Sequence, residues 1–141
     1  MKNLILTRFI IVSLLLYCLA IKAQYKSFND YFFNNYITYY SLGNFMENNN
    51  IIVVDESEKI SKYDLNYHHE ENGLVKNIQI VHRIPKEKKY LFLSDYIVNE
   101  NLAIVSFSLS DHKKYIIFTL KRKDSKTNWW ETISIYNGSM N

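Results

Sequence analysis

The sequence predicts an α+β fold in which an N-terminal amphipathic helix packs on a curved antiparallel β-sheet, a meander of about six strands. Apolar side chains recur at spacings of three and four between residues 25 and 45, and short runs of alternating apolar and polar side chains follow as far as residue 136. The first pattern is typical of a helix and the second of half-buried strands. Because no repeat or linker divides residues 24–141, we expect them to form a single α+β domain.

The expected helix carries an aromatic stripe and has signals at both ends. Ser27 is a suitable N-cap, with Asp30 three residues later, and Gly43 is a suitable stop. Further apolar residues widen the buried face, so we expect the sheet to clasp the helix. The run Asn48-Asn49-Asn50 then breaks the chain. The stripe comprises Tyr25, Phe28, Phe32, Tyr36 and Tyr39.

The Asn72-Gly73 dipeptide predicts a type I′ hairpin turn, because both residues accept positive φ. If Glu71 and Leu74 close this turn, the flanking runs align in one register. One face of the hairpin is then mostly apolar and the other polar, so the turn and the pattern agree. The apolar face pairs Tyr67 with Ile78, Leu65 with Ile80 and Tyr63 with His82, and the polar face pairs Asn66 with Gln79 and His68 with Asn77.

Further strands are expected on both sides of this hairpin. One precedes it at residues 51–54, and four follow Pro85 and a charged loop, at residues 90–98, 102–110, 114–122 and 129–136. In the second of these four, apolar residues alternate with Ser106, Ser108 and Ser110. That alternation predicts one buried face and one face in water.

Three segments of this region follow a familiar order: Ile97-Val98-Asn99-Glu100-Asn101-Leu102-Ala103-Ile104-Val105, then Tyr115 to Lys121, then Trp129-Trp130-Glu131-Thr132-Ile133. Together with the helix, they resemble the nuclear transport factor 2 like (SnoaL-like, cystatin-like) superfamily. The resemblance implies a curved sheet around a helix, with a conical pocket. Members include isomerases with a pocket carboxylate as base, dehydratases, binding domains and immunity proteins against bacterial toxins. Only one helix is expected here, where that superfamily usually has two or three.

Residues 1–23 are expected to be an export signal. Lys2 and Arg8 precede an apolar run at residues 9–19, and the small residues Ala20 and Ala23 follow it. The run is shorter than the roughly 20 residues that span a membrane. We therefore expect cleavage after Ala23 and a periplasmic or secreted mature protein.

Removal of this segment changes the charge and the thiol content. It carries Lys2, Arg8 and Lys22, so 14 of the 17 Lys and Arg remain, against 14 Asp and Glu. A neutral domain lacks the field that attracts nucleic acid or anionic lipid. Cys18, the only cysteine, lies there too, after the bulky Tyr17 where lipoprotein signals have a small residue. We expect no lipid anchor, no disulfide and no cysteine chemistry.

Two clusters of functional side chains have simpler interpretations. His68-His69-Glu70-Glu71 offers metal ligands, but strand alternation puts no more than two on one face, and zinc normally needs three. Lys121-Arg122-Lys123, Lys126 and Trp129-Trp130 could bind nucleic acid, but the neutral charge favours a solvated turn. The sequence contains no Ser-His-Asp spacing, phosphate-binding glycine loop or paired-carboxylate motif. We expect no cofactor and no metal.

These observations favour an exported domain that binds a protein partner without catalysis, as an immunity-type or envelope accessory protein. The chain contains 12 Tyr and 8 Phe, and surface Tyr offers a large amphipathic contact area. We expect binding on the sheet face away from the helix, through Ser106, Ser108, Thr132, Ser134 and Tyr136. The alternative is a small-molecule pocket protein or isomerase-like enzyme that uses His82 and Asp95, the titratable residues that alternation could turn inward.

Overall fold

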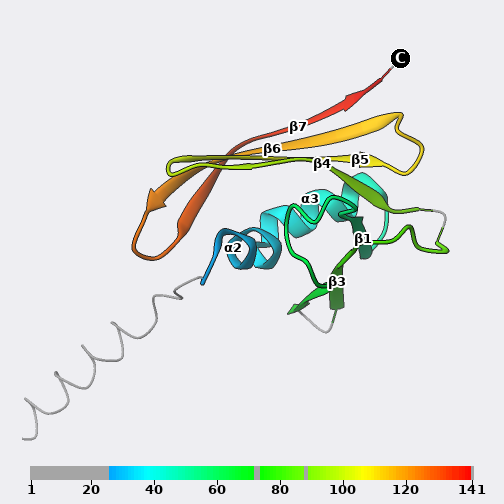
Figure 1. The fold of residues 1–141 in the computed structure, drawn as a ribbon, viewed down its shortest axis with the longest axis horizontal. Coiled ribbons are helices and arrows are strands. Elements are labelled where there is room, and N and C mark those ends of the chain that lie inside the picture. The colour runs from blue at the N-terminus through cyan, green and yellow to red at the C-terminus, as the bar shows by residue number, and fades with distance from the viewer. Residues whose placement is uncertain (1–25, 72–73, 88, 141) are drawn as a thin grey trace, which may run out of the picture.

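The computed structural model describes residues 26–71, 74–87 and 89–140, which form an α+β fold with two helices and one seven-stranded mixed sheet (Figure 1). The expected export signal, Tyr25 of the aromatic stripe, and the turn residues Asn72 and Gly73 lie outside these ranges. The sheet order is β2-β3-β1-β4-β5-β6-β7. The elements are α2 (Phe28–Asn34), α3 (Tyr36–Met46), β1 (Asn50–Val54), β2 (Leu65–Glu71), β3 (Leu74–Val81), β4 (Leu91–Val98), β5 (Leu102–Leu109), β6 (Lys114–Asp124) and β7 (Trp129–Ser139).

The helical stretch begins as expected but is divided in two. The Ser27 hydroxyl accepts a hydrogen bond from the backbone N–H of Asp30 at 3.2 Å, which confirms the N-cap. Asn35 is extended, ends α2, and caps α3 by accepting from the N–H of Ile37 at 2.8 Å. Asparagine does this well because its short side chain competes with helical hydrogen bonding.

The predicted stop at Gly43 is wrong, since α3 continues to Met46 and ends at Glu47, which has a left-handed φ of 54°. Gly43 instead lies where the chain folds back over the helix. Its carbonyl accepts from the N–H of Asn48 at 3.0 Å, and an added Cβ would lie 3.4 Å from the carbonyl oxygen of Asn48. A side chain at this position would therefore touch the turn into β1 at about van der Waals distance.

The two helices contact strands from both ends of the sheet. The ring of Phe28 lies 5.0 Å from Trp130 of β7, and the ring of Phe33 lies 5.0 Å from Tyr67 of β2. A flat sheet of seven strands would separate its two edges by about 29 Å at the usual strand spacing. The sheet therefore curves around the helices, and Figure 1 shows α2 and α3 on one side of the long strands β4 to β7.

Aromatic side chains fill the space between helices and sheet. Phe32 is fully buried, with its ring 5.2 Å from Phe118 and 6.3 Å from Phe107. Trp130 is fully buried beside them. The sheet face that meets these rings is called the inner face below, and the opposite one the outer face.

The sheet is mixed rather than antiparallel, because β1 lies between the hairpin and the meander. It runs parallel to β3, with Ile51 beside Ile78, and parallel to β4, with Val53 beside Leu91. β4 to β7 form the antiparallel meander that the alternating pattern predicted. A short, almost continuous apolar run such as β1 is typical of a central strand with paired neighbours on both sides. The alternation of apolar and polar residues does not indicate that β1 lies between β3 and β4.

The register of the hairpin is confirmed for four of the predicted pairs: Leu65 with Ile80, Asn66 with Gln79, Tyr67 with Ile78 and His68 with Asn77. The pair of Tyr63 with His82 is wrong, because the β2–β3 ladder ends at Leu65. Buried Asp55 shapes the preceding loop instead, since its carboxylate accepts from the backbone N–H groups of Lys59 and Ile60 at 2.9 and 2.7 Å. Tyr63 is left 78% exposed.

Candidate binding surfaces on the sheet

The five residues expected to form a binding surface do not share one face, because β7 contains a bulge. Ser134 pairs with Thr119 but Thr132 pairs with Leu120, so Ile133 is the extra residue. One extra residue reverses the alternation of a strand. Thr132 therefore lies on the inner face beside fully buried Leu120, and its hydroxyl oxygen is buried without a hydrogen-bond partner among the described residues.

Ser106 and Ser108 lie on the outer face but are only 5% and 4% exposed. The Ser106 hydroxyl donates to a carboxylate oxygen of Asp95 at 2.6 Å, and the Ser94 hydroxyl donates to Ser108 at 3.3 Å. β5 is a central strand between β4 and β6, so larger side chains on these neighbouring strands cover its serines and exclude water from them. These serines connect strands rather than offer contact area.

The outer face of β4 to β7 exposes apolar and aromatic groups instead. Ile97 of β4 is about half exposed, and Tyr136 of β7 is 58% exposed, next to exposed Ser134. The Tyr115 ring lies 6.0 Å from that of Tyr136 and covers Gly138, where an added Cβ would come within 2.3 Å of it. Of the predicted binding residues, Ser134 and Tyr136 thus belong to an accessible surface.

β7 is also an edge strand. It is 11 residues long and its only charged side chain, Glu131, pairs with Lys123 at 2.7 Å. Trp129, Ile133 and Tyr136 are exposed along it. A long edge with so little charge presents unpaired backbone N–H and C=O groups and is a template for another strand.

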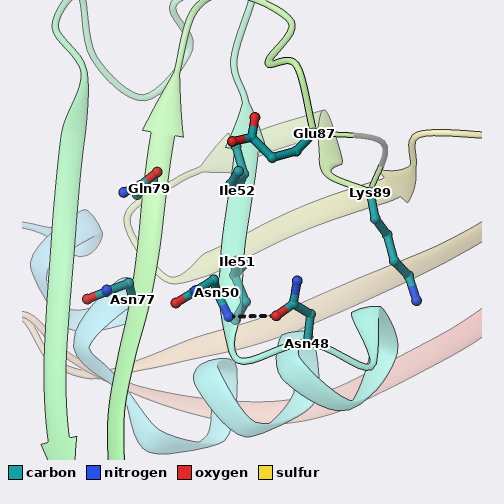
Figure 2. Close-up of a pocket in the computed structure, with 8 residues that line it drawn as sticks. All are labelled: Asn48, Asn50, Ile51, Ile52, Asn77, Gln79, Glu87 and Lys89. Carbon is teal, nitrogen blue, oxygen red and sulfur yellow. Dashed lines mark hydrogen bonds between the residues drawn. The ribbon is translucent and has the colours of Figure 1, made fainter.

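At the opposite end of the sheet, the outer face carries carboxamides around a hollow of about 570 Å³ (Figure 2). Asn50 of β1 is the register partner of Asn77 of β3, and Gln79 lies two residues further along the same face. Asn48 holds the loop before β1, because its side-chain oxygen accepts from the N–H of Asn50 at 3.0 Å. This carboxamide hollow is lined by Asn48, Asn50, Ile51, Ile52, Asn77, Gln79, Glu87 and Lys89.

A second hollow of about 540 Å³ adjoins the first at Asn48, which lines both. Tyr40 is 53% exposed there, with its ring stacked 5.9 Å from that of Tyr36. This tyrosine hollow is lined by Tyr39, Tyr40, Gly43, Asn44, Glu47, Asn48 and Asn49. The Tyr39 hydroxyl donates to the carbonyl of Asn49 at 3.2 Å, and burial raises the pKa of Tyr39 to about 12, so it stays a neutral donor.

His82 and Asp95, the residues of the pocket interpretation, lie on different parts of the surface. His82 Nδ1 lies 2.8 Å from an Asp64 carboxylate oxygen, and Nε2 lies 2.7 Å from the carbonyl oxygen of Ser61. Because both partners are acceptors, they favour the doubly protonated ring and raise the pKa of His82, the Ser61 carbonyl most. Asp95 is exposed beside Ser106 and lines none of the hollows described here.

The side chains of the predicted charged clusters do not gather on one face of the sheet. Arg122 lies on the inner face with its guanidinium carbon 4.7 Å from the centre of the buried Trp130 ring, whereas Lys123 bonds to Glu131 on the other side. His68 lies on the outer face opposite Asn77. Within the described residues no group of three or more His, Cys, Asp and Glu side chains could hold a metal ion.

Asp55 is a buried charged residue that the sequence reasoning missed. It is 1% exposed and follows the apolar run of β1 directly, a position where a carboxylate can cap the next turn. From the sequence, Asn48 and Asn50 indicate only a break after the helix, and Asn77 and Gln79 indicate only the polar face of a hairpin. Their signal was the density of Asn in residues 44–50, but only the parallel pairing of β1 with β3 brings Asn50 beside Asn77.

Among the described residues, neither helix is long and apolar enough to cross a membrane. In comparisons with protein-family models, curated proteins and solved structures, no match to this chain was found. The resemblance to the nuclear transport factor 2 like superfamily therefore stays a prediction.

Proposed function

We propose that this protein is an exported, non-catalytic domain that recognises a protein partner, as an immunity-type or envelope accessory protein does. The observation that carries the proposal is β7, an edge strand with a single charged side chain, flanked by exposed aromatic and apolar side chains. Monomeric proteins usually protect such edges with charges, prolines or a covering loop. Here the exposed edge and the outer face meet at Tyr136, so one partner can contact both.

The partner that fits this surface contributes an extended segment. Pairing with β7 would satisfy the outward backbone groups of the edge, and alternate side chains of the segment would then reach the outer face. Tyr136 and Ile97 offer apolar contact there, and Ser134 offers a hydroxyl. Lys121 lies on the same face of β6 and has no ion-pair partner among the described residues, so a carboxylate on the partner would add complementarity.

Two further features support binding rather than turnover. Aromatic rings fill the interior where an isomerase-like enzyme would need an open cone. His82 and Asp95 line no common hollow among those described. A pocket carboxylate and its electrophilic partner would have to approach one substrate within hydrogen-bond reach.

The proposed export can be tested by the mass of the protein purified from its native host. Cleavage after Ala23 leaves Gln24 as the first residue. A mature protein that retains Cys18 with an attached lipid would contradict both the cleavage site and the soluble localisation.

The proposed partner can be tested by co-purification from the native host, identification by mass spectrometry and affinity measurement with purified components. Tyr136→Lys places a charge on the β7 edge and should weaken the affinity by about 10-fold or more. Tyr63→Lys is the matched control, because Tyr63 is an exposed tyrosine in a loop away from β7, and it should leave the affinity unchanged.

Three outcomes would contradict the proposal. Equal affinities of the two variants would remove β7 from the interface. Concentration-dependent dimerisation of the pure protein that Tyr136→Lys abolishes would assign the edge to a second copy of the chain. Loss of a catalytic activity on Asp95→Asn, with no protein partner recovered, would favour the pocket-enzyme alternative.

A further inference from the structure

We infer that the carboxamide hollow and the adjoining tyrosine hollow, whose linings include no residue of β7, together form a binding site for a neutral oligosaccharide. The two hollows share Asn48 and have volumes of about 570 and 540 Å³. Each volume falls in the range of about 300–1,000 Å³ that is usual for ligand pockets. A chain of linked sugar units can therefore occupy both by crossing Asn48.

The carboxamide side chains of the hollow are neighbours on one face of two adjacent strands. Asn50 and Asn77 are directly opposed on neighbouring parallel strands, and Gln79 lies one row along the same face. Neighbouring strands are about 4.8 Å apart and same-face rows about 6.6 Å apart, which is the scale of one sugar ring with its hydroxyls. In Figure 2 Asn77 and Gln79 lie on β3 with Asn50 beside them on β1, and Asn48 lies next to Asn50, joined to it by the dashed hydrogen bond.

The chemistry of this set matches hydroxyl groups. A carboxamide has an oxygen that accepts and an amino group that donates two hydrogen bonds, and a hydroxyl both donates and accepts. Among the described residues, the side chains of Asn50, Asn77 and Gln79 make no hydrogen bond to another protein group, and the oxygen of Asn77 is buried without a partner. These groups can turn toward a ligand without breaking an internal hydrogen bond.

The charges around the hollows disfavour an ionic ligand. Lys89 pairs with Glu47 at 3.4 Å, which leaves Glu87 as the lining charge without an ion pair in the described part of the chain. A phosphate or sulfate would meet this carboxylate and no free Arg or Lys of the lining. A single carboxylate is also too few for a bound cation, which needs several oxygen ligands.

The tyrosine hollow supplies the apolar contact that sugars need. The C–H face of a pyranose ring is apolar and packs on aromatic rings, whose faces carry negative charge. The ring of Tyr40 is exposed, and stacking on Tyr36 restricts its motion. One sugar unit on Tyr40 would place the next beside Asn44 and Asn48, and a further unit over Asn50 and Gln79.

The test is an NMR titration of the purified, ¹⁵N-labelled protein with maltotetraose, cellotetraose and the tetramer of N-acetylglucosamine. At least one should shift the side-chain NH₂ signals of Asn48, Asn50, Asn77 and Gln79, with a Kd on the order of 1 mM. Gln79→Met keeps the side-chain volume and removes its hydrogen-bonding groups, so it should weaken binding by about 10-fold. Asn101→Leu, which removes an exposed carboxamide in the turn between β4 and β5, should leave the affinity unchanged.

Chain length gives a second readout. Tyr40→Ala should reduce the affinity for the tetramer to that for the corresponding disaccharide, because the unit stacked on the ring is lost. Absence of shifts with all three sugars at about 10 mM would overturn the inference. So would equal effects of Gln79→Met and Asn101→Leu, or shifts of the same signals by tetraglycine alone, which would assign the carboxamides to a peptide. Thermal melting of each variant checks that the fold is retained.

Discussion

The two ends of the one sheet share an inner face and differ on the outer face. The β2–β3–β1 end has strands of 5 to 8 residues, carries carboxamides on the outer face, and has exposed His68 and Glu70 on its edge strand. β6 and β7 at the other end have 11 residues each, and their outer face exposes Tyr136. Both ends bury aliphatic and aromatic side chains against α2 and α3. One core therefore supports two surfaces whose exposed side chains differ in chemistry.

The largest expected effect tests whether the two ends depend on the same core. Phe32 is fully buried between α2 and the sheet, next to Phe107 and Phe118. Phe32→Ala should lower the free energy of unfolding by about 3–5 kcal/mol, through lost burial and a cavity. Denaturant titration measures this, and hydrogen exchange should show both ends weakened together. Weakening confined to one end would show that the ends are separate folding units.

A smaller effect is expected at the hairpin of the polar end. Glu71 pairs with Leu74, and the predicted turn residues Asn72 and Gly73 between them lie outside the described residues. Gly73→Val should lower the free energy of unfolding by roughly 1 kcal/mol, because a β-branched residue resists positive φ. An unchanged midpoint in urea would show that the turn has another geometry. Asn99→Val, in the turn between β4 and β5, is a control for the loss of a polar turn residue.

At the apolar end, Gly138→Ala should change the surface more than the stability. The new Cβ would overlap the outer end of the Tyr115 ring, which can rotate away from β7. We expect a loss of stability of a few tenths of a kcal/mol up to about 1 kcal/mol, and loss of the Tyr115–Tyr136 ring contact. Proton NOEs between the two rings measure the contact. Retained NOEs would show that the backbone of β7 moves instead.

The smallest effect concerns pH. The folded-state pKa of His82 is raised above its ordinary value of 6.5 by the Ser61 carbonyl and the Asp64 carboxylate. This contribution to stability is fully present below pH 6.5 and is lost as the pH rises through the raised pKa. The melting temperature should therefore fall between pH 6 and pH 9 more in the native protein than in His82→Gln. Parallel profiles would mean that His82 has the same pKa in the folded and unfolded chain. The effect should be small because Asp64 is exposed and its charge is screened.

The features that follow from local chemistry could be predicted from the sequence. Ser27 caps α2 because its hydroxyl reaches an N–H three residues away, and the β2–β3 register follows from the alternation on both strands. The meander was predicted because apolar and polar residues alternate within each of the strands β4 to β7. The break at Asn35 also had a local signal, since Asn favours caps, but the aromatic stripe on either side of it outweighed that signal.

The features that depend on distant partners could not be predicted. The apolar run at residues 51–54 is typical of a central strand, but nothing within it indicates that its partners are β3 and β4. The bulge at Ile133 is defined against β6, yet it alone moves Thr132 to the inner face. The carboxamide hollow depends on the same long-range pairing, because Asn50 and Asn77 are neighbours only across β1 and β3. Sequence reasoning located part of the apolar surface and missed the polar one.

The position of β1 has a consequence for how the chain reaches this fold. β1 is the first strand to leave the ribosome, but β3 begins 20 residues after it ends, and β4 begins at Leu91. The β2–β3 hairpin can close by itself within microseconds, whereas β1 must wait for its partners with Ile51–Val54 unpaired. In a nascent chain this apolar run is open to wrong association until those partners are made. A chaperone that binds extended apolar segments would act on residues 51–54. Slower synthesis of the chain before Leu91 would lengthen the time for which that chaperone is needed.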